Sequence, residues 1–348
     1  MVYILGIETT CDESGISLIE GKEKKVRILA NELRSQVKTH SPFGGVVPIL
    51  AAREHKKNLP ILLKKIEKFF DLRKIDFLAF SVGPGLLPAL VQGKEFVLNL
   101  AKKLNKKIYP INHLQAHFYS IVIKNKLNKW QKIRNIEFPS LVLVVSGGHT
   151  NMYFFENWLK FKKLGETIDD AAGESLDKGA RILGLGYPGG PIIEKKAKLA
   201  KKSYSLPKPL LEKGLNFSFS GLKTAFLELV NDIKKAKGDL DEEEISALSL
   251  SLQKTIFEII LFKIRKAIKI YQPKSIVITG GVSANLSLRR MARKFLKNIK
   301  IYFPQKELST DNGLNIAISG YILYLNKVEP KDFNQIDVFP REKSSRLL

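Results

Sequence analysis

Cysteine is almost absent from this sequence: Cys11 is the only one among 348 residues. A chain with one cysteine forms no internal disulfide framework, and such a composition is typical of proteins in a reducing compartment. We expect the Cys11 thiol to be a packing group, with a nucleophilic role as the less favoured alternative. This scarcity argues against a disulfide-stabilised secreted domain.

Long apolar runs are also missing. No run approaches the roughly 20 residues that a transmembrane helix requires. The first residues, MVYILGIE, read as an apolar strand without the charged segment and cleavage site of a signal peptide. We therefore expect a cytoplasmic protein that makes no contact with a membrane.

Acidic residues are few relative to basic ones. The chain has 58 Lys and Arg but only 34 Asp and Glu, so its formal net charge is +24. Such a charge attracts polyanions, and nucleic acid is the leading candidate. The alternative is a lysine-rich surface of the thermophile kind, but those surfaces usually balance lysine with glutamate. The composition favours a nucleic-acid partner.

Parts of the sequence repeat one plan. Residues 3–19 and 141–155 each read as two short apolar strands joined by a polar turn. Residues 77–103 and 276–296 each read as an apolar strand, a glycine-rich turn and a helix, a geometry that directs backbone N–H groups toward an anion. The chain is long enough, and at 44% apolar enough, to bury two lobes built this way.

The repeated plan predicts an α/β protein with the two-lobe actin-like fold, a duplicated RNase H-like architecture with a central cleft for a nucleotide and a metal. We expect the first lobe to comprise residues 1–112 plus 313–348, and the second to comprise 113–312. The alternative is that these turns are ordinary turns of an unrelated α/β protein.

Three other segments are expected to have no part in the site. Residues 239–268 read as a long amphipathic helix with an acidic start. Residues 195–213 are rich in lysine and are expected to form an exposed excursion or a basic helix. The tail after Phe339 is expected to be frayed.

The five histidines are not scattered. His40 and His55 border one segment, HSPFGGVVPILAAREH, and His149 closes the turn SGGHT. His113 and His117 are spaced i, i+4, which on a helix places both imidazoles on one face, where they can chelate a divalent metal. The alternative is a pair of surface histidines one turn apart.

A third metal ligand must come from elsewhere in the chain. Asp311 in STDNGLNIA is the best candidate, because it lies in a polar turn that opens a helix. Two histidines and one carboxylate leave coordination positions open for a substrate oxygen. We expect one divalent metal per subunit, with Fe2+ as the first choice and Zn2+ as the alternative.

Glycine-rich turns supply a candidate nucleotide site. In VVSGGHT, Gly147 and Gly148 allow the backbone to approach phosphate oxygens without interference from a Cβ atom. The hydroxyls of Ser146 and Thr150 add hydrogen-bond donors. We expect this turn to bind phosphate.

A second polar group involves later parts of the chain. Asp177 in ESLDKGA and Gly190 in YPGGP are expected to face a ribose or an acyl-adenylate. Asn285 is expected to bind a nucleotide sugar or base, and capping of a helix is the competing interpretation. For the adjacent Asp169 and Asp170, helix capping is an equal alternative to a role in the site.

Two acids lie at the tip of the first predicted hairpin. Asp12 and Glu13 are expected to be exposed near the phosphates and to serve as a general base or as groups close to the metal. Acidic residues are common in turns, so an ordinary turn is the alternative.

Taken in order, these motifs resemble those of the tRNA N6-adenosine threonylcarbamoyltransferase family in its bacterial branch. The resemblance extends over nearly the whole chain, through GIETTCDESG, HSPFGGVVPILAAREH, GPGLLPALVQG, NHLQAH, VVSGGHT, TIDDAAGESLDKGARILGLGYPGGP, NFSFSGLKTA, TGGVSAN and TDNG. It implies an actin-like fold and transfer of a threonylcarbamoyl group from threonylcarbamoyl-AMP to a tRNA. The acceptor is N6 of the adenosine just 3′ of the anticodon, in tRNAs that read codons beginning with A.

The resemblance also implies residue roles and partners. His113, His117 and Asp311 match the family's metal ligands. The positions that match the family's adenylate site are Val144, Val145, Ser146, Gly147, Gly148, Asp177, Gly190 and Asn285. The implied protein partners are a smaller inactive paralogue and a P-loop ATPase, and the positive charge of the chain fits a tRNA.

Three rival functions remain at this stage. A zinc protease of the HExxH type needs a glutamate beside the first histidine, but Leu114 and Gln115 occupy the positions that follow His113. An ATP-dependent kinase or chaperone of the same fold needs neither a histidine pair nor tRNA. A non-enzymatic RNA-binding subunit predicts tRNA binding that survives loss of both imidazoles.

Overall fold

The computed structural model describes residues 1–341, so most of the tail after Phe339 lies outside the described residues. The chain divides into two compact units. Unit 1 comprises residues 1–136, 158–160 and the described residues from 304 onward, and unit 2 comprises 137–157 and 161–303. This division differs from the expected one.

The difference concerns two segments. Residues 113–136 and 304–312 were expected in the second lobe but belong to unit 1. The first continues directly from the last parallel strand of the unit 1 sheet, and the second leads into the helix that covers that sheet. Both predicted histidine ligands and Asp311 therefore lie in the same unit.

Unit 1 is built on a six-stranded sheet with the order β5-β4-β1-β2-β3-β6. The pairs β1–β4 and β4–β5 are parallel, and the pairs β1–β2, β2–β3 and β3–β6 are antiparallel. The strands are β1 (Val2–Glu8), β2 (Glu13–Lys22), β3 (Lys25–Ser35), β4 (Phe77–Gly83), β5 (Lys107–Asn112) and β6 (Trp130–Lys132).

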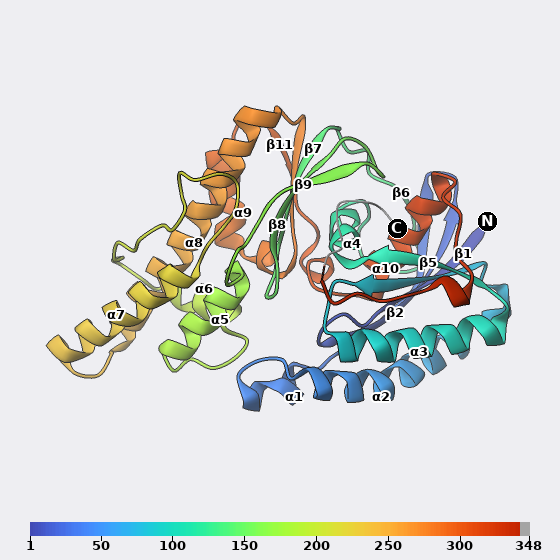
Figure 1. The fold of residues 1–348 in the computed structure, drawn as a ribbon, viewed down its shortest axis with the longest axis horizontal. Coiled ribbons are helices and arrows are strands. Elements are labelled where there is room, and N and C mark those ends of the chain that lie inside the picture. Colours follow the sequence, from blue (N-terminus) through green and yellow to red (C-terminus); the bar gives the residue numbers. More distant parts are fainter. Residues whose placement is uncertain (342–348) are drawn as a thin grey trace. The chain divides into compact units, whose positions relative to one another are not determined.

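Helices cover both faces of this sheet (Figure 1). Leu5 and Ile7 of β1 belong to the apolar core that the sheet forms with α2 and α3. Gly6 points to the opposite face, because side chains alternate along a strand. An added Cβ on Gly6 would lie 2.3 Å from the backbone nitrogen of Ala317, so α10 packs directly on the strand. The helices of unit 1 are α1 (Val37–His40), α2 (Pro48–Glu67), α3 (Leu87–Leu104), α4 (His113–Tyr119) and α10 (Gly313–Leu325).

Unit 2 is built on a five-stranded sheet with the order β11-β10-β7-β8-β9. The pair β7–β8 is antiparallel, and β10 pairs in parallel with both β7 and β11. The strands are β7 (Ser140–Val145), β8 (Thr150–Phe155), β9 (Phe161–Glu166), β10 (Ser275–Thr279) and β11 (Lys300–Tyr302). The helices are α5 (Ala172–Ile182), α6 (Gly189–Ala197), α7 (Ser220–Lys237), α8 (Glu242–Tyr271) and α9 (Leu286–Phe295).

The long helix α8 is more buried than its predicted amphipathic character implied. Its side chains supply much of the unit 2 core, and even Lys263 is fully buried. The expectation that no segment approaches a membrane-spanning helix was wrong, because α8 is long and apolar enough. However, 72% of its most apolar 18-residue window is buried inside the protein. In the segment 195–213, α6 ends at Ala197 and the rest is irregular.

The two sheets confirm the predicted duplication. In each unit, the first two strands form an antiparallel pair, and the fourth and fifth strands add in parallel on the other side of the first. The turn between β1 and β2 therefore corresponds to the turn between β7 and β8. Each of these turns contains residues that the sequence assigned to a site.

Candidate metal centre and nucleotide-binding turns

The helix α4 holds both predicted histidine ligands. It begins directly after β5, where Asn112 caps it by accepting hydrogen bonds from the backbone nitrogens of Leu114 (2.9 Å) and Gln115 (3.3 Å). The rings of His113 and His117 are 4.7 Å apart between centroids, and both are almost fully buried. The predicted one-face arrangement is present.

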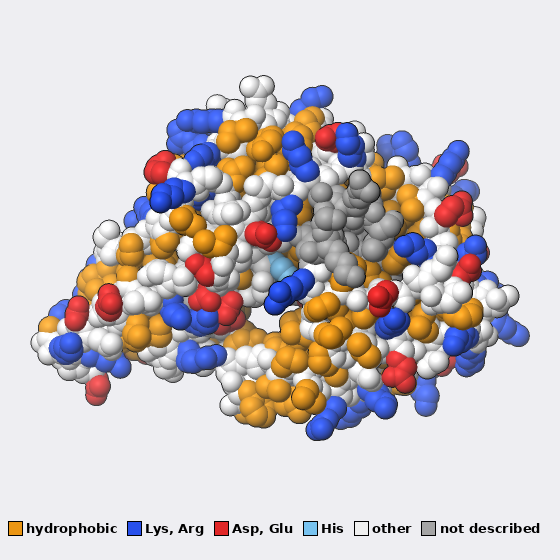
Figure 2. Space-filling model, in the orientation of Figure 1, with side chains coloured by type: hydrophobic (Ala, Val, Ile, Leu, Met, Phe, Trp, Pro, Cys, Tyr) orange, Lys and Arg blue, Asp and Glu red, His pale blue; other side chains and the backbone are white. Residues whose placement is uncertain are grey.

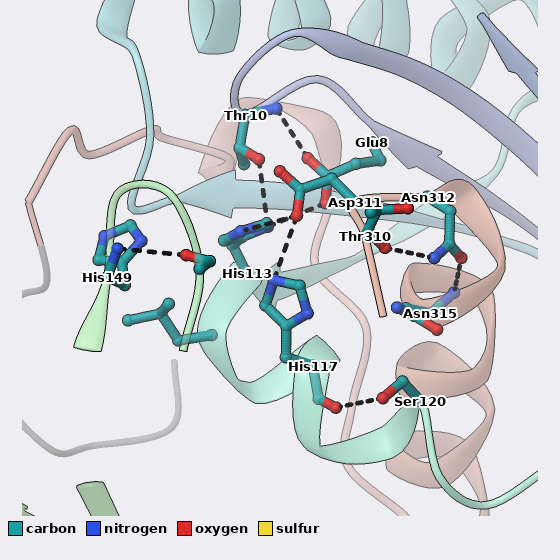
Figure 3. Close-up of polar contacts among 12 residues, drawn as sticks. Glu8, Thr10, His113, His117, Ser120, His149, Thr310, Asp311, Asn312 and Asn315 are labelled. Atoms are coloured by element: carbon teal, nitrogen blue, oxygen red, sulfur yellow. Dashed lines mark hydrogen bonds and ion pairs between the residues drawn. The ribbon is translucent and has the colours of Figure 1, made fainter. Parts of the chain in front are cut away.

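Asp311 completes this group (Figure 3). It lies just before α10, which Asn312 caps by accepting a hydrogen bond from Asn315 N at 2.9 Å. Oδ1 of Asp311 lies 3.1 Å from Nε2 of His117 and 3.5 Å from Nε2 of His113. One ligand atom from each residue lies within 4.8 Å of the other two. The sequence-predicted triad is therefore assembled within unit 1.

The spacing of these atoms fits a metal ion. Tetrahedral coordination with bonds of 2.0–2.2 Å separates neighbouring ligand atoms by roughly 3.4 Å. The two distances from Asp311 to the imidazole nitrogens, 3.1 and 3.5 Å, lie on either side of this value. Two imidazoles and one carboxylate suit Fe2+ or Zn2+.

Sequence reasoning missed Glu8, which supports this group from the end of β1. Its Oε2 lies 3.1 Å from Nδ1 of His113, and its Oε1 accepts hydrogen bonds from Thr10 N (2.7 Å) and Ser81 Oγ (2.8 Å). A carboxylate on one ring nitrogen orients the imidazole and leaves the other nitrogen for a metal. The available signal was a glutamate that ends an otherwise apolar strand.

The electrostatics of this region favour a cation. Burial alone lowers the pKa of His113, but the Asp311 and Glu8 carboxylates outweigh it and raise the pKa to about 9. The same carboxylates that hold a proton on this ring in the metal-free protein would attract a divalent ion to it.

Asp12 and Glu13 are not the exposed acids that the sequence predicted. Asp12 is only 9% exposed, and Glu13 is partly buried at the start of β2. Burial, followed by the charges of Asp12 and Asp311, raises the pKa of Glu13 well above its ordinary value. Burial and Asp12 also raise the pKa of the Cys11 thiol, which suits a packing role better than a nucleophilic one.

His40 and His55 belong to a buried network of hydrogen bonds. Val47 N donates to Nδ1 of His40 (3.3 Å), so Nε2 of His40 is the atom that donates to Oε1 of Gln36 (3.1 Å). Nε2 of Gln36 then donates to Nδ1 of His55 (3.3 Å), and Nε2 of His55 donates to the Cys11 carbonyl (2.9 Å). The network connects the segment before α2 to the β1–β2 turn.

The β7–β8 turn in unit 2 is open around its glycines. An added Cβ on Gly147 or Gly148 would have no atom within 4 Å, and both glycines are exposed. The turn is closed by Ser146, whose nitrogen donates to the His149 carbonyl at 2.8 Å and whose Oγ accepts from His149 N at 3.1 Å. Val144 and Val145 are buried strand residues, so only their backbone is available to a ligand. Thr150 is fully buried and accepts from the Ala172 nitrogen.

Asp177 and Gly190 are neighbours in unit 2. Oδ1 of Asp177 accepts hydrogen bonds from Gly189 N (2.7 Å) and Gly190 N (3.2 Å) at the start of α6. Burial raises the pKa of Asp177 despite these two donors. Its second carboxylate oxygen is the part with capacity for a ligand.

Asn285 and Asp169 cap helices. Oδ1 of Asn285 accepts from Ser287 N (2.9 Å) and Leu288 N (3.2 Å) at the start of α9, and its Nδ2 donates to Gln253 at 2.7 Å. These contacts are those expected if Asn285 caps the helix α9. Asp169 accepts from Phe219 N at 2.7 Å at the start of α7.

Asp170 has a different partner. It forms an ion pair with Lys178 at 2.6 Å. For Asp169 and Asp170, the structure therefore shows scaffold contacts.

Comparison with known proteins gives one consistent result. The family profile of tRNA N6-adenosine threonylcarbamoyltransferase matches residues 27–318. The tRNA N6-adenosine threonylcarbamoyltransferase of Mycoplasma mobile is 43% identical over 326 residues, which are 94% of this chain and 99% of that protein. The Thermodesulfovibrio yellowstonii protein of the same name is 40% identical over 93% of this chain and 95% of its own length.

Solved structures share the fold at low sequence identity. Component A of the Acidaminococcus fermentans (R)-2-hydroxyglutaryl-CoA dehydratase aligns with a TM-score of 0.53 and 15% identity, over 94% of this chain and all of that one. HypF of T. kodakarensis aligns with a TM-score of 0.59 and 14% identity, over 96% of this chain and 49% of that one. These similarities, with the two equivalent sheets, show the actin-like fold that the sequence predicted.

Proposed function

Because the chain belongs to the tRNA N6-adenosine threonylcarbamoyltransferase family, we propose that His113, His117 and Asp311 hold the divalent metal of its reaction. Membership of this family identifies the reaction. The enzyme transfers the threonylcarbamoyl group from threonylcarbamoyl-AMP to N6 of the adenosine 3′ of the anticodon, and AMP leaves. The observation that carries the proposal is the convergence of the three ligand atoms in one unit.

The metal is proposed to be Fe2+, with Zn2+ as the alternative. When bound, it supplies a Lewis acid that polarises an oxygen of the donor and neutralises charge as AMP leaves. Asp311 and the imidazoles of His113 and His117 would hold it, one ion per subunit. Glu8 and Thr10 fix the orientation of the His113 ring.

The adenylate is proposed to bind the turns of unit 2. The backbone of Val144, Val145 and Ser146 leads into the open glycines of the β7–β8 turn, where phosphate oxygens can approach N–H groups. The residues proposed to contact the adenylate are Val144, Val145, Ser146, Gly147, Gly148, Asp177, Gly190 and Asn285. The last two contribute through the helix starts that they form.

Asp12 or Glu13 is proposed as the general base. In the transfer step, the exocyclic amine of adenosine attacks the carbamoyl carbon and forms a C–N bond. The bond from that carbon to the phosphate oxygen of the adenylate breaks, and the amine proton passes to the base. Burial and the charges of Asp12 and Asp311 raise the pKa of Glu13, and a carboxylate with a raised pKa is a stronger base than an ordinary one.

Two protein partners complete the proposal: a smaller inactive paralogue and a P-loop ATPase. Exposed apolar side chains provide a surface for a protein partner over the beginnings of α2 and α3 (Figure 2). These side chains are Phe43 (62% exposed), Ile49 (62%), Leu87 (47%) and Val91 (44%). An apolar patch of this kind on a protein surface is typical of an interface. The location is proposed to be the cytoplasm, without membrane contact.

The experiment that tests the function is mass analysis of nucleosides from tRNA incubated with the enzyme, threonylcarbamoyl-AMP and the partners. The modified adenosine should form with the wild-type protein and not with His113→Ala or His117→Ala. Peptide cleavage by the metal-loaded protein, without tRNA modification, would favour the protease alternative instead.

A further inference from the structure

One edge of the unit 1 sheet carries exposed lysines around an exposed tryptophan. The β2–β3 turn and the segment that ends in β6 come together there, because β6 pairs with β3 in a register that places Lys132 opposite Lys25 and Trp130 opposite Arg27. We name this group of residues the edge patch. It consists of Lys22, Lys24, Lys25, Lys124, Lys126, Lys129, Trp130 and Lys132, all of them exposed.

The charge of the edge patch is not neutralised by nearby acids. Glu23 is the one acidic residue within segments 22–27 and 124–134. Among residues 1–341, acidic side chains form ion pairs with several lysines and arginines. None of these is one of the seven lysines of the edge patch. The patch therefore presents a positive field to solvent.

The lysine cluster that is most conspicuous in the sequence behaves differently. Within residues 195–202, Lys196 pairs with Glu242 at 2.5 Å and Lys202 with Glu244 at 2.7 Å. Lys198 also has an acidic partner, Glu194 on the same helix. The positive charge of this segment of unit 2 is therefore partly neutralised by ion pairs within the protein.

Trp130 gives the edge patch an aromatic surface that is fixed in place. The Arg27 guanidinium lies 5.2 Å from the centre of its ring, and Arg27 is itself held by the buried Glu20, whose Oε2 accepts from Nε at 2.7 Å. The side chain of Trp130 nevertheless remains 40% exposed. An exposed, supported ring among cations is the arrangement on which nucleic-acid bases stack.

We propose that the edge patch binds RNA, with its lysines on the phosphate backbone and Trp130 stacked on an unpaired base. The identity of that RNA as the tRNA substrate rests on the proposed function. The patch belongs to the same unit as the metal ligands. Its second segment begins at Lys124, five residues after α4 ends at Tyr119, so the chain between these two residues spans at most about 18 Å.

The test measures binding of the full-length protein to an unmodified tRNA transcript over a range of salt concentrations. A triple variant, Lys24→Glu, Lys129→Glu and Lys132→Glu, should weaken binding about tenfold or more. The plot of log affinity against log salt concentration should also become less steep, and its slope should fall in magnitude by about 2–3. Each lysine that no longer binds a phosphate should lower the magnitude of the slope by about 1. Lys→Arg changes at the same positions should retain binding.

A matched control separates this effect from a change of net charge. Lys56→Glu, Lys57→Glu and Lys64→Glu alter the same number of charges on exposed positions of α2. Trp130→Ala should weaken binding about fivefold to 150-fold, the range for loss of one stacked base, and Trp130→Phe should retain most of the binding. Unfolding curves of all variants test whether they fold like the wild-type protein.

The outcomes are distinct. The proposal is overturned if the edge-patch triple variant binds tRNA as well as the α2 control does, or if the wild-type protein does not bind tRNA. Modification of tRNA by the wild-type enzyme is measured separately. If the wild-type enzyme modifies tRNA but the patch variants bind tRNA normally, only the RNA-binding role of the edge patch is rejected. If tRNA binds through the edge patch but is not modified, only the proposed function is rejected.

Discussion

Nε2 of His117 lies 3.1 Å from Oδ1 of Asp311, although unit 2 in its entirety separates the two residues in the chain. The contact requires α4 to follow β5 directly and α10 to return to the same sheet. The proposed metal site therefore depends on two segments that are far apart in the chain.

Replacement of Asp311 by Asn should remove the metal. The amide carries no negative charge and binds Fe2+ or Zn2+ poorly, so metal affinity should fall by about 100-fold or more. Metal content by mass spectrometry and transfer activity are the measurements. Asp337→Asn, an exposed acid paired with Lys94 in the same unit, is the control. Full metal content in Asp311→Asn would contradict the assignment.

Glu8→Gln should weaken metal binding while the fold persists. Glutamine can still accept the hydrogen bonds from Thr10 and Ser81, but it removes the charge that orients His113. Loss of such a supporting carboxylate costs about 10–100-fold in metal affinity. Titration against a competing chelator measures the effect, and Ser81→Ala, which leaves the carboxylate in place, should change the affinity far less. Equal affinities in the two variants would count against a role for Glu8.

His55→Leu should loosen the β1–β2 turn. The change removes the donor to the Cys11 carbonyl and the shortest hydrogen bonds of Ser14 Oγ (2.8 Å) and Gln36 Nε2 (3.3 Å), and only their longer contacts remain. The cost should be about 1–3 kcal/mol in the free energy of unfolding. Because Cys11 is the one cysteine in the sequence, its rate of labelling by a thiol reagent reports on the turn directly. Labelling should accelerate in this variant. His149→Leu, in unit 2, should leave the rate unchanged.

Glu244 should make the stability of unit 2 depend on pH in the acid range. Hydrogen bonds from Lys202, Lys237 and Tyr204 lower its pKa to about 2. Because the folded-state pKa is below the ordinary value of 4.5, this stabilisation is fully present above about pH 4.5 and is lost as the pH falls toward 2.

The variant Glu244→Gln tests this dependence. At neutral pH its free energy of unfolding should be about 1–3 kcal/mol lower than that of the wild-type protein. The difference from wild type should shrink steadily between pH 4.5 and 2 in denaturant titrations. Glu243→Gln, an exposed neighbour on the same helix, should show no such difference. A gap between wild type and Glu244→Gln that is independent of pH would refute the assignment.

Local patterns in the sequence were sufficient for much of the fold. The repeated hairpins predicted β1–β2 and β7–β8, because alternating short apolar runs and polar turns are local signals. The spacing of His113 and His117 predicted α4 for the same reason. Asp311 was recognisable because it stands in a polar turn before an apolar helix.

Other features depended on tertiary structure and were not predictable from local patterns. The division into units differs from the expected one because residues 113–136 stay with the sheet that precedes them. Asp12 was expected to be exposed as a turn acid, yet packing around the β1–β2 turn leaves it 9% exposed. The role of Glu8 depends on its distance from His113, a residue that is far away in the chain.

The helix α10, at residues 313–325, adds its part of the unit 1 core only after unit 2 has been made, and Ile336 and Phe339 follow it into that core. At synthesis rates of 5–20 residues per second, roughly 10–40 s pass between the emergence of β5 and that of α10. During this interval the nascent chain presents one face of an incomplete sheet, while the later unit can already close around its own core. The unit that contains the proposed metal ligands is therefore the last to complete its core during translation.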